Sequence, residues 1–536
     1  MMSIATSATA LTIFTINDGT NDTDRNNAAA TCVCQDTQGS PKCTLRAAIE
    51  TLNGCQASSG PFSITFAVQT VHVINGGLPT ITAPVTITGP VAIDGQNGQF
   101  KEGCLGFSDA ASAQFPDGAT NSQVTLLSIS NCSGDAIAAN GHGFLFSGNV
   151  LHDNVGAGLS LSSSRTYGNF VNTAALDAIF NNPLFPPIPV SGNDVNSFAQ
   201  QLATVLVTLN PSTISGNFIY SNGGDGIWLF SENLGAVFVS GNFIGTDPTG
   251  DLPLGNAGAG VRLSGGTFGN MIGPGNVIGD NANGIEDSSP TVYLPNFVMS
   301  NRIGVPSVTP GNHVGNTNSG ITTSTKPDDA IDHKNPTGVS LLVGPANIIS
   351  DNKGAPNSND ADLLPTDGAG VLITGASSGV KVVGNTIGMT DIPAGTPLQS
   401  KNYGNAADGV IVTSSGNTVQ GNTIAGNKRH GVVVQGNSTN GTSVVGNTIG
   451  LYPAFANDKT LGNGFDGIHI DAASATAVGG PNQSDGNTIV ANGRNGVAMR
   501  HGGSSNGWGN LIQNDTIYGN AVGNPAALPN PLPAGS

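Results

Sequence analysis

A short motif, Gly-Asn followed by any residue and then Ile or Val, recurs along much of the chain and restricts the fold more than any other feature. It occurs at 216–219, 241–244, 269–272, 275–278, 384–387, 416–419, 421–424, 446–449, 486–489 and 509–512. A second motif, a small or polar residue and Gly followed by apolar–any–apolar, alternates with it. Examples are "DGIWL" (225–229), "AGVRL" (259–263), "DGVIV" (408–412), "HGVVV" (430–434), "DGIHI" (466–470) and "NGVAM" (495–499).

Each motif predicts a strand of about four residues with one buried face, because its apolar residues recur with a period of two. We interpret the Gly and Asn residues as turn residues that supply backbone conformations with positive φ. A single short strand cannot bury its apolar face alone, whereas successive coils that stack directly on one another can. The spacing therefore predicts an all-β parallel solenoid rather than a series of hairpins.

Composition limits the classes of partner. Only 10% of the residues are Asp, Glu, Lys or Arg, and the net charge is −17. Duplex nucleic acid is not expected as a partner, because phosphate binding needs clustered basic residues. The sequence contains no run of about 18 apolar residues, which is the length that a membrane-spanning helix needs. The sequence gives no indication of the oligomeric state.

Six cysteines fall within the first 132 residues, at Cys32, Cys34, Cys43, Cys55, Cys104 and Cys132. An even and clustered set favours disulfides and an oxidising compartment over a zinc site, because "CVC" lacks zinc-ligand spacing and no His lies nearby. The first 20 residues lack the pattern of a signal peptide. We nevertheless expect a secreted or cell-surface protein, on the strength of the cysteines.

Three segments are expected along the chain. Residues 1–60 form a cysteine-bearing cap, in which 43–54 is a short helix capped by Thr44. Residues 61–520 form the solenoid, interrupted by a helical excursion near 172–210. Residues 521–536 form a Pro-rich tail of irregular structure.

The segment "CVCQDTQGSPKCTLRAAIETLNG" (32–54) resembles the N-terminal part of bacterial CSLREA-domain proteins, on the stretch from Cys43 to Ile49 together with Asn53. The repeats at 241–285 resemble those of the same group. This resemblance implies a right-handed parallel β-helix that is secreted or at the cell surface, and it implies little chemistry. Other right-handed β-helices include polysaccharide lyases, hydrolases, epimerases and phage tailspikes, so the fold permits polysaccharide chemistry without showing it.

Stacking the second motif predicts a candidate site. The residue before Gly begins each strand, and in the last repeats it is Asp408, His430, Asp466 and Asn495. Adjacent coils lie about 4.8 Å apart, so Asp408 and Asp466 should flank His430 at two coils' separation. The residue after the first apolar position should point outward, which gives a column of Trp228, Arg262, Glu286, Ile411, Val433, His469 and Ala498.

We expect catalytic roles for Asp408, His430, Asp466, His469 and Arg500. We expect substrate binding by Lys428, Arg429, Arg494, His501 and Trp228. A lyase needs a cation beside the uronate carboxylate and a base, whereas a hydrolase needs two carboxylates. The structural alternative is a ladder of polar turn residues. No metal site is expected among these residues, although the loops 246–251 and 357–367 carry oxygen ligands suited to Ca²⁺.

Two functions from different classes remain open. The first is an extracellular protein that binds a polysaccharide along the solenoid face around 408–501 and, as a further hypothesis, cleaves it as a lyase or glycoside hydrolase. The second is a non-catalytic surface adhesin or structural module.

Overall fold

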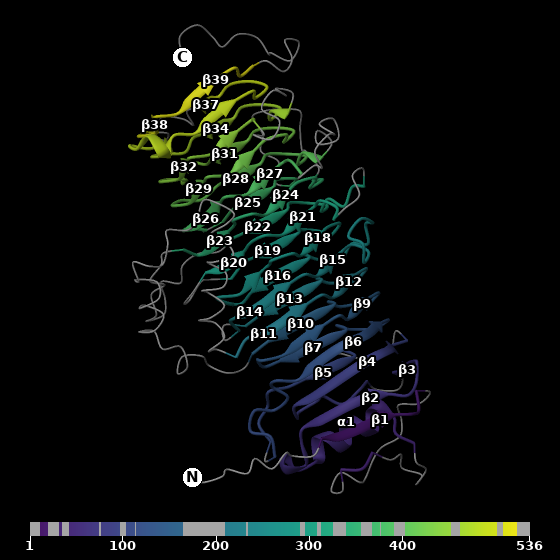
Figure 1. The fold of residues 1–536 in the computed structure, drawn as a ribbon. Coiled ribbons are helices and arrows are strands. Elements are labelled where there is room, and N and C mark those ends of the chain that lie inside the picture. The colour runs from purple at the N-terminus through teal and green to yellow at the C-terminus, as the bar shows by residue number, and fades with distance from the viewer. Residues whose placement is uncertain are drawn as a thin grey trace, which may run out of the picture.

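The computed structural model describes residues 11–19, 32–34, 42–73, 77–96, 103–112, 114–163, 210–231, 234–289, 295–307, 312–324, 339–354, 367–375, 377–390, 403–451, 461–500 and 508–521. Within these ranges the chain is a right-handed parallel β-helix. The strands stack along one axis from β1 to β39, and helix α1 lies at the N-terminal end of the stack (Figure 1). This arrangement confirms the fold class predicted from the repeats.

From β7 onward each coil contributes three strands, one to each of three parallel columns that we call B, A1 and A2. Column B is the 12-stranded sheet. It consists of β5 (Leu105–Phe107), β7 (Ile137–Asn140), β10 (Leu159–Ser162), β13 (Ile227–Phe230), β16 (Val261–Ser264), β19 (Ile285–Asp287), β22 (Ile321–Thr323), β25 (Val371–Ile373), β28 (Val410–Val412), β31 (Val432–Gln435), β34 (Ile468–Asp471) and β37 (Val497–Arg500).

Columns A1 and A2 together form the 27-stranded sheet, because the long strands β4 and β6 pair in both columns. Column A1 consists of β1 (Thr12–Ile16), β2 (Phe62–Phe66), β4 (Val85–Asp94), β6 (Gln123–Ser130), β8 (Leu145–Ser147), β11 (Ser212–Ser215), β14 (Val237–Ser240), β17 (Met271–Ile272), β20 (Asn296–Val298), β23 (Leu341–Val343), β26 (Val380–Val383), β29 (Thr418–Gln420), β32 (Ser443–Val445), β35 (Ala477–Gly479) and β38 (Leu511–Gln513). The strands particular to column A2 are β3 (Thr70–His72), β9 (Val150–His152), β12 (Phe218–Tyr220), β15 (Phe243–Ile244), β18 (Val277–Ile278), β21 (Arg302–Ile303), β24 (Ile348–Ile349), β27 (Thr386–Ile387), β30 (Thr423–Ile424), β33 (Thr448–Ile449), β36 (Thr488–Val490) and β39 (Thr516–Tyr518).

Alternation within each strand sends apolar side chains into a continuous core. Ile424, Ile449 and Ile489 follow one another in column A2 and are fully buried. Val410, Val432 and Ile468 do the same in column B. Every coil buries its inward residues against the coils above and below, which is why strands of two to four residues are stable here.

The Asn of the first motif has a different role from the one its sequence position indicates. The preceding Gly takes the positive φ, as Gly216 and Gly421 show, and the motif Asn residues are not among the residues with positive φ. Most of the motif Asn side chains point inward and belong to the first of two buried ladders. The second ladder is built from other Asn residues, which lie between the column A2 and column B strands. The first ladder runs through Asn149, Asn217, Asn242, Asn276, Asn301, Asn347, Asn385, Asn422, Asn447, Asn487 and Asp515.

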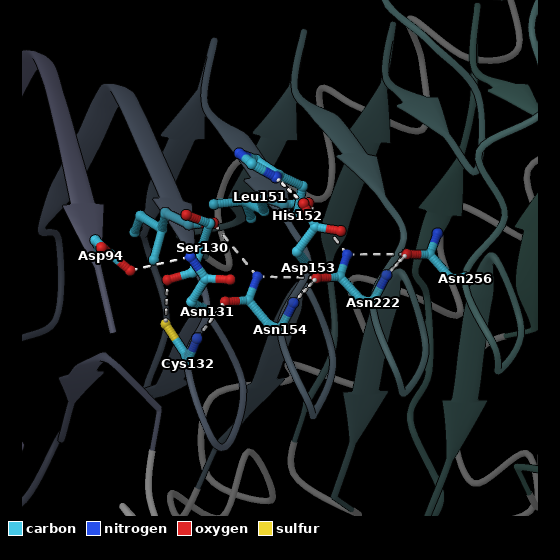
Figure 2. A network of polar contacts seen from close by, with 11 residues as sticks. Asp94, Ser130, Asn131, Cys132, Leu151, His152, Asp153, Asn154, Asn222 and Asn256 are labelled. Atoms are coloured by element: carbon cyan, nitrogen blue, oxygen red, sulfur yellow. Dashed lines mark hydrogen bonds and ion pairs between the residues drawn. The ribbon is translucent and has the colours of Figure 1, made fainter. Parts of the chain in front are cut away.

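The second ladder runs through Asn154, Asn222, Asn256, Asn281, Asn316, Asn352, Asn405, Asn427, Asn463, Asn492 and Asn520. Figure 2 shows its beginning, where Cys132, Asn154, Asn222 and Asn256 follow one another across successive coils. Each Asn Nδ2 donates to the Oδ1 of the next Asn, so the buried turn groups are satisfied coil after coil.

The N-terminal segment covers the first coil. Helix α1 (Leu45–Gly54) begins after Thr44, whose side chain accepts a hydrogen bond from the amide of Ala47, as predicted. Its residues Ile49 and Leu52 join the main core. Short 3-10 helices occur at Ala57–Ser59 and Gln483–Asp485. All helices in the described ranges fall short of what crossing a bilayer requires.

The predicted disulfides are confirmed, with pairs Cys32–Cys55, Cys34–Cys43 and Cys104–Cys132. The division into cap, solenoid and tail stays a prediction. The helical excursion expected at 172–210 lies outside the described residues except for residue 210, and the expected tail lies outside them except for residue 521.

Candidate functional site

The polar residues before the column B strands form a hydrogen-bonded ladder of their own. In each pair a side chain accepts the backbone N–H of the matching residue one coil later. Asp135 Oδ1 accepts from Ala157 at 2.7 Å, and Asp225 Oδ1 accepts from Ala259 at 2.7 Å. Asp408 Oδ1 accepts from His430 at the same distance. In the structural alternative, polar side chains at these positions serve only to hydrogen-bond the turn backbone, and these contacts do so. Each contact uses one carboxylate oxygen of the Asp side chain.

The structure brings together Asp408, His430, Asp466 and His469. Their strands β28, β31 and β34 are consecutive in column B, so Asp408 and Asp466 lie on either side of His430, two coils apart. His430 Nδ1 lies 3.3 Å from Asp466 Oδ2, and His469 Nδ1 lies 3.0 Å from the same oxygen. The imidazole rings have centroids 4.6 Å apart. We call these four residues the acid–base cluster.

Two arginines and Phe465 pack against the acid–base cluster. Arg429 Nε lies 3.7 Å from Asp408 Oδ2. The guanidinium of Arg494 lies 4.1 Å from the ring centroid of Phe465, and the same ring packs edge-on against His430. All four residues of the cluster and Arg429 are buried, with Asp408 fully so. A polymer could reach these groups only if the surrounding chain opened.

Burial raises the pKa of the Asp408 carboxyl above its ordinary value, although His430 and Arg429 act in the opposite direction. Burial would also raise the pKa of Asp466, but the imidazoles of His430 and His469 outweigh it and hold that pKa far below its ordinary value. Two carboxyls on one column thus have pKa values shifted in opposite directions, which is an arrangement that acid–base catalysis uses.

The remaining predicted site residues do not all join the cluster. Arg500 is exposed and pairs in register with Asp471 at the far end of β34 and β37. Asp471 lies five positions after Asp466, a distance of about 16 Å along an extended strand. Lys428 is exposed beside Arg429. His501 lies outside the described residues. Trp228 lies on β13, seven coils before His469 on β34, and is in register with Arg262.

The predicted outward column is present but is not exposed throughout. Ile411 and Val433 lie in register with His469, as expected. Both are buried, because they pack with Ala369 in a small apolar cluster outside the main core. The expectation of a continuous exposed face from Trp228 to His469 is therefore wrong.

Donor atoms of His430, Asp466 and His469 lie within 4.8 Å of one another, so these residues could in principle hold a metal ion. Hydrogen bonds already occupy some of these donor atoms. His430 Nδ1 accepts the amide of Asp466 at 3.1 Å, and Asp466 Oδ1 accepts both the amide and the side chain of Asn495 at 2.9 Å. The nearby Arg429 disfavours a further cation by charge repulsion, whereas His430 Nε2 has no hydrogen bond in the described residues.

The loop 246–251 is likewise explained by hydrogen bonds. Asp247 Oδ1 accepts the amides of Asp251 and Leu252, and Oδ2 accepts the Thr249 hydroxyl at 2.6 Å. Burial pushes the pKa of Asp247 upward, but these hydrogen bonds outweigh it and hold the pKa below its usual value. The carboxylate closes a turn here. The other Ca²⁺ candidate, 357–367, lies outside the described residues except for Asp367.

An open groove of about 440 Å³ lies over the first strands of column B. Its floor consists of small outward residues in register on β5, β7 and β10, namely Gly106, Ala138 and Ser160. On β13 the next residue in this row is Trp228, whose side chain borders the floor and forms the wall of the groove. Three steps of about 4.8 Å give this row a length of about 14 Å.

The wall of the groove is aromatic and fixed in place. Trp228 and Phe230 stack with ring centroids 4.3 Å apart, and Trp228 Nε1 donates to Ser264 Oγ at 3.0 Å. Polar side chains also line the groove, namely Thr80, Ser108, Asp135, Asn140, Ser160 and Ser162. Sequence reasoning found Trp228 but missed the floor. The signal was available, because "DAIAAN" (135–140) and "AGLSLS" (157–162) continue the second motif upstream with small residues at outward positions.

No family model matches the sequence, and comparison with curated proteins gives no match either. Among solved structures, the chain is similar to the A-module of mannuronan C-5 epimerase AlgE6 from Azotobacter vinelandii, with 13% identity, 85% of this chain and 83% of that chain covered, and a TM-score of 0.36. It is also similar to tailspike protein 3 of bacteriophage CBA120, with 10% identity, coverage of 94% and 64%, and a TM-score of 0.35. For the periplasmic alginate epimerase AlgG the identity is 12%, the coverage 85% and 75%, and the TM-score 0.27. The strand pairings of columns B, A1 and A2 themselves show that the chain is a right-handed parallel β-helix repeat protein.

Proposed function

We propose that the protein binds a polysaccharide in the column B groove. One observation carries this proposal: a fixed aromatic wall, Trp228 and Phe230, borders a row of small residues flanked by hydroxyl, amide and carboxylate groups. A sugar ring has an apolar face of C–H groups and a rim of hydroxyls. The first suits a flat aromatic side chain, and the second suits side chains that both donate and accept hydrogen bonds.

The polar side of the groove is organised before any ligand arrives. Ser160 Oγ donates to Asp135 Oδ2 at 2.5 Å, while Asp135 Oδ1 is held by the amide of Ala157. Each carboxylate oxygen has a further lone pair that a sugar hydroxyl can use. Because the strands beneath are rigid and hydrogen-bonded, little ordering entropy is lost when a ligand binds.

The cellular location belongs to the same proposal. Three disulfides support an oxidising compartment, and hence export or display at the cell surface.

Membership of the CSLREA-domain group is likewise proposed. The matching residues have physical roles here: Cys43 is disulfide-bonded to Cys34, Thr44 caps α1, and Leu45 enters the core.

The test is titration calorimetry with a broad panel of neutral and acidic oligosaccharides. Trp228→Ala should weaken binding at least about tenfold, as expected for a central aromatic anchor. Phe243→Ala is the matched control, because Phe243 stacks on Phe218 in column A2, away from the groove. An unchanged affinity in Trp228→Ala, or silence across the whole panel, would refute the proposal.

Cleavage by the acid–base cluster is a second candidate function. Two observations favour it: Asp466 orients His469 through a 3.0 Å contact, and His430 Nε2 is buried without a hydrogen bond in the described residues. In this proposal His430 or His469 is the base, Asp408 and Asp466 are the carboxyls, and Arg500 is the catalytic cation. Substrate binding falls to Lys428, Arg429, Arg494 and His501.

Activity would be followed as unsaturated products and as new reducing ends, with and without Ca²⁺. His469→Ala should abolish any activity found while leaving the thermal midpoint within a few degrees of the parent. Full activity in His469→Ala would exclude the cluster as the active centre. Binding at the groove with no cleavage of any bound glycan would instead favour the adhesin alternative.

A further inference from the structure

We infer that the column B groove selects an uncharged glycan over a polyuronate, an inference that rests on the proposed function of the groove. Asp135 is the one charged side chain among the described residues that line it. A ligand carboxylate placed on the floor would therefore meet a negative charge and no lining cation. Neutral hydroxyls, in contrast, can donate directly to Asp135.

The arginine next to the aromatic wall does not change this balance. Arg262 lies in register with Trp228 on the neighbouring strand β16. Its Nε lies 2.8 Å from Asp225 Oδ2, and its Nη1 lies 2.7 Å from Glu286 Oε1. Two carboxylates thus surround one guanidinium. A uronate approaching Arg262 would therefore meet a guanidinium whose positive charge is already balanced by two carboxylates, and would be repelled by both.

The charge of the whole chain acts in the same direction. The chain has 34 Asp and Glu residues against 17 Lys and Arg, a net charge of −17. An anionic polymer would be repelled at long range as well as at the groove, and added salt would weaken that repulsion. Local and long-range charge therefore both favour a neutral chain, in contrast to the cationic surroundings of the acid–base cluster.

A matched pair of ligands tests the inference: one uronate polysaccharide and the same polysaccharide after chemical reduction of its carboxyl groups to alcohols. We expect the reduced form to bind at least about tenfold more tightly at low salt, with a smaller difference at high salt. Equal or tighter binding of the parent polyuronate would overturn the inference. If neither form binds, nor any other neutral glycan, the proposed function itself fails.

Two isosteric variants separate the groove from the long-range field. Asp135→Asn keeps an oxygen for the Ala157 amide but removes the groove's charge, and should improve polyuronate binding a few-fold relative to the neutral form. Asp153→Asn makes the same change in net charge at an exposed residue next to column A2, and should improve it less. An equal effect of both variants would show that the groove itself does not discriminate.

Discussion

Replacing one ladder asparagine should destabilise the solenoid far more than replacing its neighbour. Asn422 is 1% exposed, and four side-chain hydrogen bonds join it to the adjacent coils. In Asn422→Ala, Asn385 Nδ2 keeps its bond to Val343 O, and Asn447 Oδ1 still accepts the amide of residue 422. The Asn385 amide and the Val382 carbonyl lose the partners that Asn422 supplied.

The Val382 carbonyl still faces the parallel ladder with β29, so the Asn385 amide is the group left without a partner. A buried group in that state costs about 1–3 kcal/mol. Thr423→Ala is the control, because this neighbouring side chain points outward from β30 and is half-buried. Its substitution should cost less than about 1 kcal/mol.

Long repeat arrays do not unfold in a single step, so the assay should be local. Hydrogen exchange at the Asn385 amide should accelerate about thirtyfold in Asn422→Ala, which corresponds to about 2 kcal/mol. Exchange at the same rate as in Thr423→Ala would refute the idea that the ladder, and not the apolar core alone, holds consecutive coils together.

Three further predictions concern stability. Burial raises the pKa of Asp287 to about 7. The free energy of unfolding should therefore fall by about 4 kcal/mol in total as pH rises from about 4 to 7, and then stay level. Asp287→Asn should flatten this slope in melts recorded across pH, and an unchanged slope would contradict the assignment. Removing the Cys104–Cys132 disulfide with a double Ala variant should cost about 3–4 kcal/mol, given the 28-residue separation, and a melt insensitive to its loss would count against this estimate. Thr44→Ala should cost about 1 kcal/mol by removing the cap of α1, measurable as a lower thermal midpoint of the N-terminal coils, and an unaltered midpoint would argue against the cap.

Much of the architecture follows from the sequence because the repeats encode it locally. Gly with positive φ marks many of the corners, and alternation decides which residues enter the core, so the fold and the stacking of Asp408, His430 and Asp466 could be predicted. The ladder role of the motif Asn could not, because its partners lie in neighbouring coils, 25 residues away for Asn422 and Asn447. A short-range pattern does not distinguish a turn residue from an inward amide.

The candidate site was harder to predict for two physical reasons. Alternation gives the direction of a side chain but not what covers it, so Ile411 and Val433 were expected on a surface and are buried. A groove depends on side-chain size at outward positions of several coils, which no single motif contains. Gly106, Ala138 and Ser160 are unremarkable one by one, and they form a floor only when stacked beside Trp228.

Hydroxyl-radical footprinting of the full chain, with and without the tightest oligosaccharide from the binding panel, tests the central claim most directly. Our account predicts that the bound glycan protects Trp228 and Phe230 from oxidation, while Phe465 beside the acid–base cluster is unchanged. Protection of Phe465 with Trp228 and Phe230 oxidised as before would contradict the account and place the ligand at the other end of column B.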